Sequence, residues 1–209
     1  MHAEPSLGLR ERKKLDTRRA LSDAALTLAF ENGLENVTRE DIAGRAGVSL
    51  RTFSNYFTGK YDAIAYRQTE RVRRSLDALR SRPADEPLWA AVTAAVLEPL
   101  ETEGAADVLP SAAQLAEVRK VMSTPQATIA ATHGAFADWA EVIAARTGTD
   151  AERDLYPRLV VGVIAAVVEA ATKTYVNTDP PVHITTVLRQ GFATVADGLP
   201  APSHREGHS

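Results

Sequence analysis

The sequence contains no cysteine among its 209 residues. Disulfides, thiolate metal sites and cysteine nucleophiles are therefore excluded, and the absence fits a reducing compartment. The longest uninterrupted apolar run is the ten residues Leu159–Val168, which Glu169 ends. A membrane-spanning helix needs about 20 apolar residues, so this run predicts a buried helix instead. The N-terminus also lacks the basic and apolar stretches of a signal peptide, and we expect a cytoplasmic protein.

The motifs of common enzymes are missing as well. The sequence has no Gly-x-Ser-x-Gly, no His-Glu-x-x-His and no glycine-rich phosphate loop. Its five histidines, at positions 2, 133, 183, 204 and 208, are scattered along the chain. They offer neither a nucleophile–base pair nor a set of metal ligands. We therefore expect no enzymatic activity, no metal and no cofactor.

Helical periodicity runs through the sequence, and no segment alternates convincingly with a period of two. We predict an all-α protein of about nine helices. The expected helices cover residues 15–32, 38–46, 49–56, 60–81, 88–103, 111–123, 125–147, 150–177 and 182–198. Asn32-Gly33, Gly47 and Asp179-Pro180-Pro181 are the clearest breaks between them.

Charge is distributed unevenly along this helical chain. Residues 1–74 hold 14 Lys and Arg against 10 Asp and Glu, whereas residues 75–209 hold 10 against 17. A basic first third on an acidic remainder is typical of a polyanion-binding unit attached to a body with another role. Chance clustering of charge is the alternative.

Two short helices joined by a tight turn are predicted between positions 38 and 57. Thr38 and Ser49 are N-cap residue types, and Asp41 follows Thr38 by three residues, as in a capping box. Gly47 breaks the first helix after about two turns. The residues spaced to pack against the helix over 15–32 are Val37, Ile42, Val48, Phe53 and Phe57. A helix-turn-helix of this kind places its second helix in the major groove of DNA.

The exposed face of that second helix would carry Arg51, Ser54 and Asn55. Arg can pair with guanine and Asn with adenine, while Leu50 or the methyl group of Thr52 can touch a thymine methyl. The alternative is that Arg51 and Asn55 are solvated surface residues. The basic stretch over 10–19 can approach a phosphate backbone or a minor groove.

The residues over 38–60 resemble the DNA-binding domain of the TetR family of bacterial repressors. The resemblance covers roughly residues 15–67. It is carried by Thr38-Arg39-Glu40-Asp41-Ile42-Ala43, Ala46-Gly47-Val48-Ser49, Thr52-Phe53, Asn55-Tyr56-Phe57 and Lys60. It implies phosphate contacts from Thr38, Ser49, Thr52, Tyr56 and Lys60, and base-facing positions at Leu50, Arg51 and Asn55. Arg39 completes the expected DNA-binding set.

The sequence departs from the family pattern at three positions. Ser54 stands where an aromatic residue is common, Tyr56 stands where His is common, and Tyr61 stands where an acidic residue is usual. The Tyr56 hydroxyl can still donate to a phosphate. Ser54 reaches less far, so a backbone contact there is expected to be lost or moved.

Two helices near the C-terminus carry apolar residues on more than one side, as in a helix that is covered twice. The resemblance implies that they form a four-helix bundle across a two-fold axis with a second copy of the chain. The candidate interface residues are Leu159, Val163, Val167, Val187, Leu188, Phe192 and Val195. Gly162 and Gly191 would allow close approach of helices. The alternative is that both helices are only intramolecular core.

Further apolar stripes over 89–143 face inward at helical spacing and offer a ligand pocket. Large aromatic residues among many alanines leave scope for a cavity with an apolar lining. The candidate pocket residues are Trp89, Val92, Val96, Leu100, Leu115, Val118, Met122, Ile129, His133, Phe136 and Trp139. His133 would either orient a ligand head group or be a satisfied core histidine, and the stripes themselves could be plain core.

The chain also resembles a branch of the TetR family that binds acyl-CoA-like ligands, through Arg51-Thr52-Phe53, Asn55-Tyr56-Phe57 and Asp154-Leu155-Tyr156-Pro157-Arg158. We therefore expect a homodimeric repressor, released from an inverted-repeat operator by a small apolar effector such as a fatty acid or acyl-CoA. The alternatives are a helical architectural DNA-binding protein without an effector, and a small helical enzyme.

We divide the chain into four parts on these grounds. Residues 1–14 are expected to form a flexible basic arm, and residues 15–67 a helix-turn-helix DNA-binding domain. Residues 68–199 would form a ligand-binding and dimerisation domain, and residues 200–209 a disordered tail.

Overall fold

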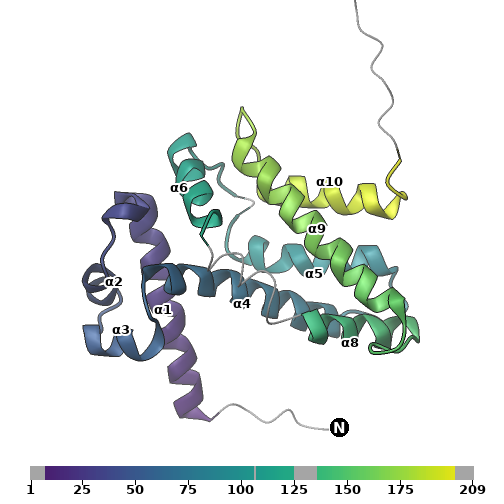
Figure 1. Ribbon diagram of the computed structural model, residues 1–209, viewed down its shortest axis with the longest axis horizontal. Coiled ribbons are helices and arrows are strands. Elements are labelled where there is room, and N and C mark those ends of the chain that lie inside the picture. Colours follow the sequence, from purple (N-terminus) through teal and green to yellow (C-terminus); the bar gives the residue numbers. More distant parts are fainter. Residues whose placement is uncertain (1–7, 106, 125–135, 201–209) are drawn as a thin grey trace, which may run out of the picture. The chain divides into compact units, whose positions relative to one another are not determined.

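The structure, a computed structural model, describes residues 8–105, 107–124 and 136–200. Within these ranges it contains nine α-helices, one 3-10 turn and no strand (Figure 1), which confirms the all-α prediction. The elements are α1 Leu9–Asn32, η1 Leu34–Asn36, α2 Arg39–Arg45, α3 Leu50–Tyr56, α4 Lys60–Ser81, α5 Leu88–Thr102, α6 Ala112–Met122, α8 Phe136–Thr147, α9 Leu155–Asn177 and α10 Ile184–Ala196.

The described residues form two compact units. The first contains residues 8–73 and 111–124, and the second contains residues 74–105, 107–110 and 136–200. Helix α4 therefore begins in unit 1, and its last residues belong to unit 2. The segment 111–124, which carries α6, groups with unit 1, although we expected it in one domain spanning 68–199.

Two helices begin more than two residues away from their expected starts. Helix α1 begins at Leu9, so residues 9–14 continue the helix instead of forming an arm; this stretch consists of Leu, Arg, Glu and Lys, which are good helix formers. Helix α9 begins at Leu155 because the Asp150 carboxylate accepts the amides of Glu152 and Arg153, at 2.8 and 2.9 Å, in a turn. The helix expected over 125–147 is described from Phe136 onward, and residues 125–135 lie outside the described residues.

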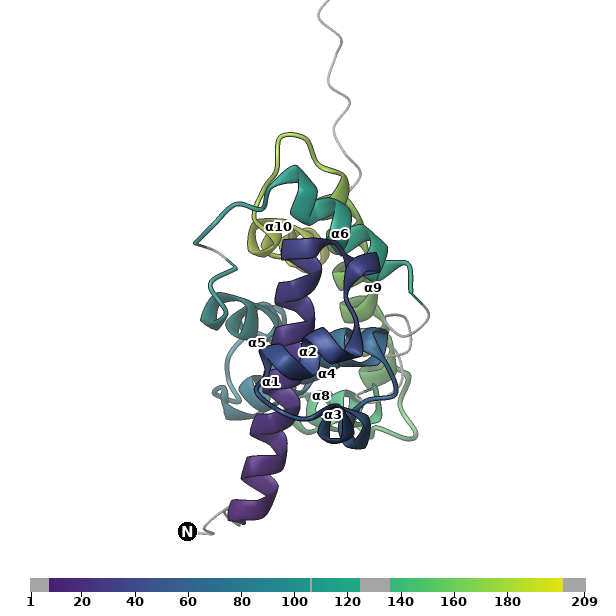
Figure 2. The same ribbon diagram turned by 90° about the vertical axis from the view of Figure 1, so that its left-hand side faces the viewer.

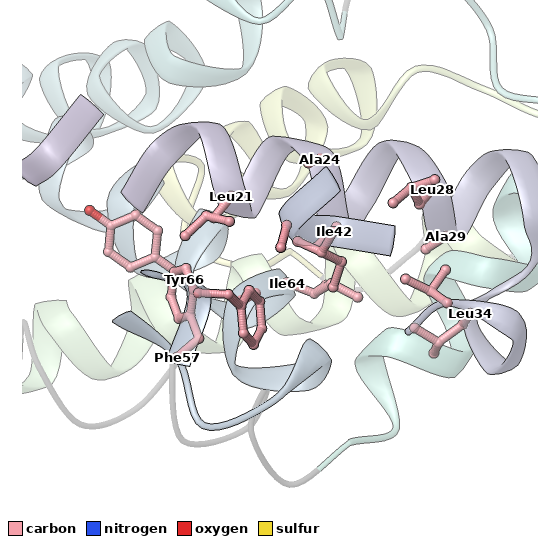
Figure 3. Packing of buried hydrophobic residues seen from close by; sticks show 14 residues of the cluster. Leu21, Ala24, Leu28, Ala29, Leu34, Ile42, Phe57, Ile64 and Tyr66 are labelled. Atoms are coloured by element: carbon pink, nitrogen blue, oxygen red, sulfur yellow. The ribbon is translucent and has the colours of Figure 1, made fainter. Parts of the chain in front are cut away.

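Unit 1 is built around one apolar face of α1. Leu21, Ala25 and Ala29 are each 0% exposed and recur at helical spacing on that face. In Figure 3, side chains from η1, α2, α4 and the end of α3 meet this face, among them Leu34, Ile42, Phe57 and Ile64. Helices α2 and α3 lie on the same side of α1 in both ribbon views (Figure 2). The helix-turn-helix is thus fixed by packing against α1.

A buried carboxylate on α4 also ties α1 to α4. Glu70 is 8% exposed, and it accepts N–H groups from Arg19 of α1 at 3.1 Å and from Arg73 at 3.3 Å. Burial alone would raise the pKa of Glu70, but hydrogen bonds from Arg73, Tyr66 and Arg19 outweigh it and hold the pKa below its usual value. Burial and the Glu70 charge in turn raise the pKa of Tyr66 to about 12. The Arg18 guanidinium lies 4.3 Å from the centre of the Tyr66 ring.

Replacing this carboxylate should change how stability depends on pH. We expect Glu70→Gln to lower the free energy of unfolding at pH 7 by about 1–3 kcal/mol, because Arg19 and Arg73 lose a charged acceptor. The folded-state pKa lies below the unfolded value of about 4.3. The ionised group therefore stabilises the fold above that pH, and the stabilisation is lost as the pH falls through the folded value. Urea unfolding at pH 7 and in acid should show that the difference in free energy of unfolding between wild type and variant becomes smaller as the pH falls.

The control is Glu169→Gln, which removes an exposed carboxylate paired with Lys173 at 2.6 Å and should change stability little at either pH. A Glu70→Gln deficit that stays constant into acid would contradict the role of the buried charge.

Unit 2 is formed by α5, α8, α9 and α10, with Val92, Ile143 and Phe192 fully buried at 0% exposure. The Trp89 and Phe192 rings lie 6.5 Å apart and join α5 to α10. Helix α10 approaches α9 closely at Gly191, where an added Cβ would lie 2.9 Å from Cγ1 of Val167. Gly191 therefore allows close approach within one chain.

A methyl group at this crossing should push the two helices apart. We expect Gly191→Ala to lower the free energy of unfolding by about 1–3 kcal/mol through overpacking against the stiff Val167 side chain, despite the better helix propensity of Ala. Gly44→Ala in α2 is the matched control, because no described atom outside its own turn of α2 lies within 4 Å of its added Cβ. Urea unfolding should show the control unchanged or slightly stabilised; equal effects of the two changes would contradict the close approach.

Helix α9 presents an uncovered apolar face. Its buried side, which includes Val160, Ile164 and Ala171, packs within unit 2. On the other side, Leu155 is 75% exposed and Leu159 is 54% exposed. Among the described helices, α9 alone is long and apolar enough to cross a membrane, judged by length and composition. The core helix of a soluble protein passes the same test. Unit 2 therefore leaves this side of α9 uncovered.

Candidate functional site

Helix α2 begins with the predicted capping box. The Thr38 hydroxyl accepts the Asp41 amide at 3.1 Å, and the Asp41 carboxylate accepts the Thr38 amide at 3.0 Å. The Thr38 side-chain and backbone hydrogen bonds lower the pKa of Asp41, which keeps this cap ionised at neutral pH. Thr38 and Arg39 are exposed at this helix start, where a helix N-terminus favours anions such as phosphate.

Helix α3 follows a turn that depends on Gly47, whose φ of +69° is a left-handed conformation that favours glycine. Ser49 caps α3: its hydroxyl accepts the Thr52 amide at 3.1 Å and lies 2.9 Å from the Thr52 hydroxyl. The predicted caps and turn are therefore all present. They orient the first turn of α3, which carries Leu50 and Arg51.

The two faces of α3 differ sharply. Phe53 is 0% exposed and Phe57, just past the helix end, is 3% exposed, so one face is fixed in the core of unit 1. Arg51, Ser54 and Asn55 are exposed on the other face, and Leu50 is 39% exposed. These positions can present a guanidinium, a hydroxyl and a carboxamide together to base edges in a groove.

The other side chains expected to contact phosphate are either half-buried or already hydrogen-bonded within the chain. Thr52 and Tyr56 are half-buried. The Lys60 ammonium donates to the carbonyl oxygens of Leu34 at 2.8 Å and Glu35 at 3.1 Å. The sequence offered no signal for this second role of Lys60, because its partners are backbone atoms of a 3-10 turn 25 residues earlier.

The departure at Tyr61 has a local explanation. Its ring lies 5.4 Å from the Lys60 ammonium, a favourable cation–π distance. The carboxylate that usually caps this helix start is supplied one residue later, because Asp62 accepts the Thr58 amide at 3.0 Å. The start of α4 is thus capped without an acidic residue at position 61.

The expected pocket residues are divided between the two units. Leu115, Val118 and Met122 lie on α6 in unit 1, with Met122 43% exposed. In unit 2, Val92 and Trp139 are buried, Val96 and Leu100 are half-buried, and Phe136 is 44% exposed. Ile129 and His133 lie outside the described residues.

An open hollow of about 590 Å³ lies in unit 2 between α5 and α10. Among the expected pocket residues, Trp89 lines it. Thr93, Leu97 and Phe192 form other parts of its wall, and its charged side chains are Arg82, Glu98, Glu101 and Arg189. Arg189 pairs with Glu101 at 3.1 Å.

The expected interface residues separate into covered and open positions. Val167, Leu188 and Phe192 are buried within the chain, at 9%, 2% and 0% exposure, so a partner could not reach them without rearrangement. Leu159 is exposed, and Val163, Val187 and Val195 are half-buried.

In the part of the chain that the structure describes, no group of three or more His, Asp or Glu side chains could hold a metal ion.

Unit 1 therefore has the geometry of a helix-turn-helix DNA-binding unit, attached to a second helical unit. Residues 21–64 match the family model described as bacterial regulatory proteins, tetR family, and residues 86–200 match the model described as MftR C-terminal domain. The HTH-type transcriptional regulator TcmR of Streptomyces glaucescens is 32% identical over 207 aligned positions, and the match covers 92% of this chain and 86% of TcmR.

Two solved structures share the fold. The fatty acid degradation regulator FadR from Bacillus halodurans has a TM-score of 0.57 at 20% identity, covering 89% of this chain and 97% of FadR. FadR from Thermus thermophilus, a TetR-family transcriptional repressor in complex with lauroyl-CoA, has a TM-score of 0.58 at 17% identity, covering 92% of this chain and all of that one. The chain belongs to the TetR family of bacterial transcriptional regulators. The relatives are regulators of transcription, not enzymes.

Arg51 is the exposed α3 residue best suited to read a base, and its removal tests that role. We expect Arg51→Ala to weaken binding to specific DNA by about 1–3 kcal/mol while changing binding to random DNA far less, because a bidentate contact to guanine carries sequence information. Arg45→Ala is the matched control: it removes the same charge from a guanidinium already paired with Glu31 at 2.6 Å.

Fluorescence anisotropy with both DNAs measures the difference. If Arg51→Ala weakened specific and random DNA equally, Arg51 would be a phosphate contact only.

Proposed function

We propose that the protein is a dimeric repressor that binds an inverted-repeat operator through α3 and is released by a small apolar effector. The observation that carries the proposal is the division of α3 into a buried aromatic face and an exposed face bearing Arg51 and Asn55. Burial fixes the orientation of the helix, so the exposed side chains are pre-positioned for a major groove. Around Leu50, Arg51 and Asn55, contacts to the DNA phosphate backbone would come from Thr38, Arg39, Ser49, Thr52, Tyr56 and Lys60.

A second copy of the chain is the proposed cover for the apolar face of α9. Leu155 and Leu159 are largely exposed there, and, outside its own turn of α9, nothing in the described chain lies within 4 Å of a Cβ added at Gly162. Small residues at Gly162 and Ala166 would let a partner helix approach closely. Half-buried Val163, Val187 and Val195 could extend such an interface, whereas Leu188 and Phe192 are already used within the chain.

Two-fold symmetry would give the operator its form. In a dimer the two α3 helices read half-sites about 34–36 Å apart, or a multiple of this distance, so the DNA site should be an inverted repeat. A regulator that binds chromosomal DNA in a bacterium works in the cytoplasm, which is the proposed location.

The proposed effector is amphipathic with a long apolar part, such as a fatty acid or acyl-CoA. The supporting observations are the hollow of unit 2, whose wall includes Trp89, Leu97 and Phe192, and the similar fold of the Thermus thermophilus regulator that was solved with lauroyl-CoA. The effector would release DNA by preferring a conformation with lower DNA affinity, with a typical coupling of about 1–3 kcal/mol.

The proposal is tested by selecting double-stranded DNA from a random library with the purified full chain, followed by titration of the complex with lauroyl-CoA. We expect an inverted repeat bound at one dimer per site, and weaker binding once lauroyl-CoA is added. Light scattering gives the stoichiometry, and free CoA is the control ligand. Selection of no consensus sequence would refute the regulator. A consensus bound equally with and without lauroyl-CoA would refute the acyl-CoA effector and leave DNA recognition intact.

A further inference from the structure

Helix α6 is part of the segment that matches the C-terminal domain of the family, yet it packs within the DNA-binding unit. The match covers residues 86–200, whereas residues 111–124 group with residues 8–73 in unit 1. Val121 of α6 packs against the apolar core that surrounds α1. A segment outside the helix-turn-helix therefore helps to build the unit that carries it.

The polar contact between α6 and the rest of unit 1 is made by Glu117. Its carboxylate accepts the amide of Leu34, the first amide of the 3-10 turn η1, at 2.8 Å. The first amides of a helical turn have no partner within the turn, so Glu117 supplies the missing acceptor. Lys120 holds the other carboxylate oxygen at 2.6 Å, and the Glu117 side chain is 13% exposed. Hydrogen bonds from Lys120 and from the Leu34 amide lower the pKa of Glu117, because both bonds favour its ionised form.

The carbonyl oxygens of the first two residues of η1 are held by Lys60, the first residue of α4. The Lys60 ammonium donates to the carbonyl oxygens of Leu34 at 2.8 Å and Glu35 at 3.1 Å. The side chain of Leu34 is 1% exposed and anchors the turn in the core. Carboxylate, turn and ammonium thus form one continuous chain of hydrogen bonds that runs from α6 through η1 to the start of α4.

This chain of contacts matters because Lys60 is an expected phosphate contact. A lysine side chain has a flexible four-carbon stem, and fixing it in one place costs conformational entropy when DNA binds. The two carbonyl oxygens of η1 hold the ammonium before DNA arrives and take two of its three N–H groups. The third N–H remains to be donated to a phosphate oxygen.

We propose that Glu117 is a positioning residue for DNA binding: it fixes η1, and η1 holds the Lys60 ammonium where a DNA phosphate can accept its remaining N–H. Glu117 itself touches no DNA in this arrangement. The proposal rests on the DNA-binding function proposed above and adds a residue from outside the helix-turn-helix to it.

The test compares four variants on the selected operator DNA by fluorescence anisotropy. Glu117→Ala leaves the Leu34 amide without an acceptor, and we expect an affinity about tenfold lower. Glu117→Gln keeps a side-chain oxygen as acceptor and should bind within about threefold of wild type. Lys120→Ala is the matched control, because it removes the ion pair of Glu117 and spares its bond to Leu34; it should bind as wild type does. Lys60→Ala should weaken operator and random DNA alike and lower the salt slope by about one.

Two readouts separate positioning from general loss of structure. In the double variant of Glu117→Ala and Lys60→Ala, the losses should not add, because both changes remove the same phosphate contact. Glu117→Ala alone should also lower the salt slope by about one, as Lys60→Ala does. Thermal unfolding of each variant checks that unit 1 remains folded at the temperature of the binding assay. Wild-type affinity of Glu117→Ala, or fully additive losses, would overturn the proposal.

A third readout needs no DNA. In ¹H–¹⁵N spectra of the full chain, Glu117→Ala should shift the Leu34 amide resonance and speed its hydrogen exchange, whereas Lys120→Ala should not. Unchanged exchange at Leu34 would overturn the proposal even if DNA affinity fell. If wild type selected no DNA consensus, the proposed function would fail, and the Leu34 exchange would still decide whether Glu117 holds the turn.

Discussion

A helix of seven residues such as α3 is too short to persist alone in water. It exists in this chain because Phe53 is completely buried and Phe57 packs beside it, with ring centres 6.0 Å apart. The Phe57 ring also lies 5.7 Å from the Tyr66 ring of α4. The exposed face of α3 depends on this packing, since a helix that could rotate would not present Arg51 and Asn55 together. Burial on one side of α3 is therefore the condition for the proposed reading of DNA on the other.

The rest of unit 1 stiffens that arrangement with polar contacts. Glu70 joins α1 to α4, and the Lys60 ammonium joins the start of α4 to η1. Each contact satisfies a group that would be costly to leave without a partner in a half-buried environment. The same physical requirement explains why the carboxylate of Glu117, far along the chain, accepts the amide of Leu34, which has no acceptor within η1.

The sequence predicted unit 1 well because its signals are local. Capping residues at Thr38 and Ser49, the glycine at position 47 and the spacing of Phe53 and Phe57 each act within a few residues, and all are present as expected. The start of α1 at Leu9 was missed because a charged, good helix-forming stretch looks the same as a flexible basic arm. The contact of Glu117 with Leu34 could not be predicted, since one partner is a backbone amide 83 residues away.

The second unit was predicted less completely for a related reason. An apolar stripe shows that a face is covered but does not show what covers it. Phe192 and Leu188 read as possible interface residues, but they are buried within the chain, and Phe192 lies against Trp89 of α5. Leu159, on the same kind of stripe, is exposed. The packing of α10 against α5 and against α9, close at Gly191, separates the two cases.

Sequence-specific DNA binding is the central claim, and the ratio of the affinities for operator and random DNA tests it most directly. The measurement is the dissociation constant of the full chain for its selected operator and for random DNA of equal length, across a range of salt concentrations. Both affinities should fall as salt rises, with the operator remaining at least about 10³-fold tighter. Equal affinities for operator and random DNA throughout the series would contradict the claim that α3 reads a sequence.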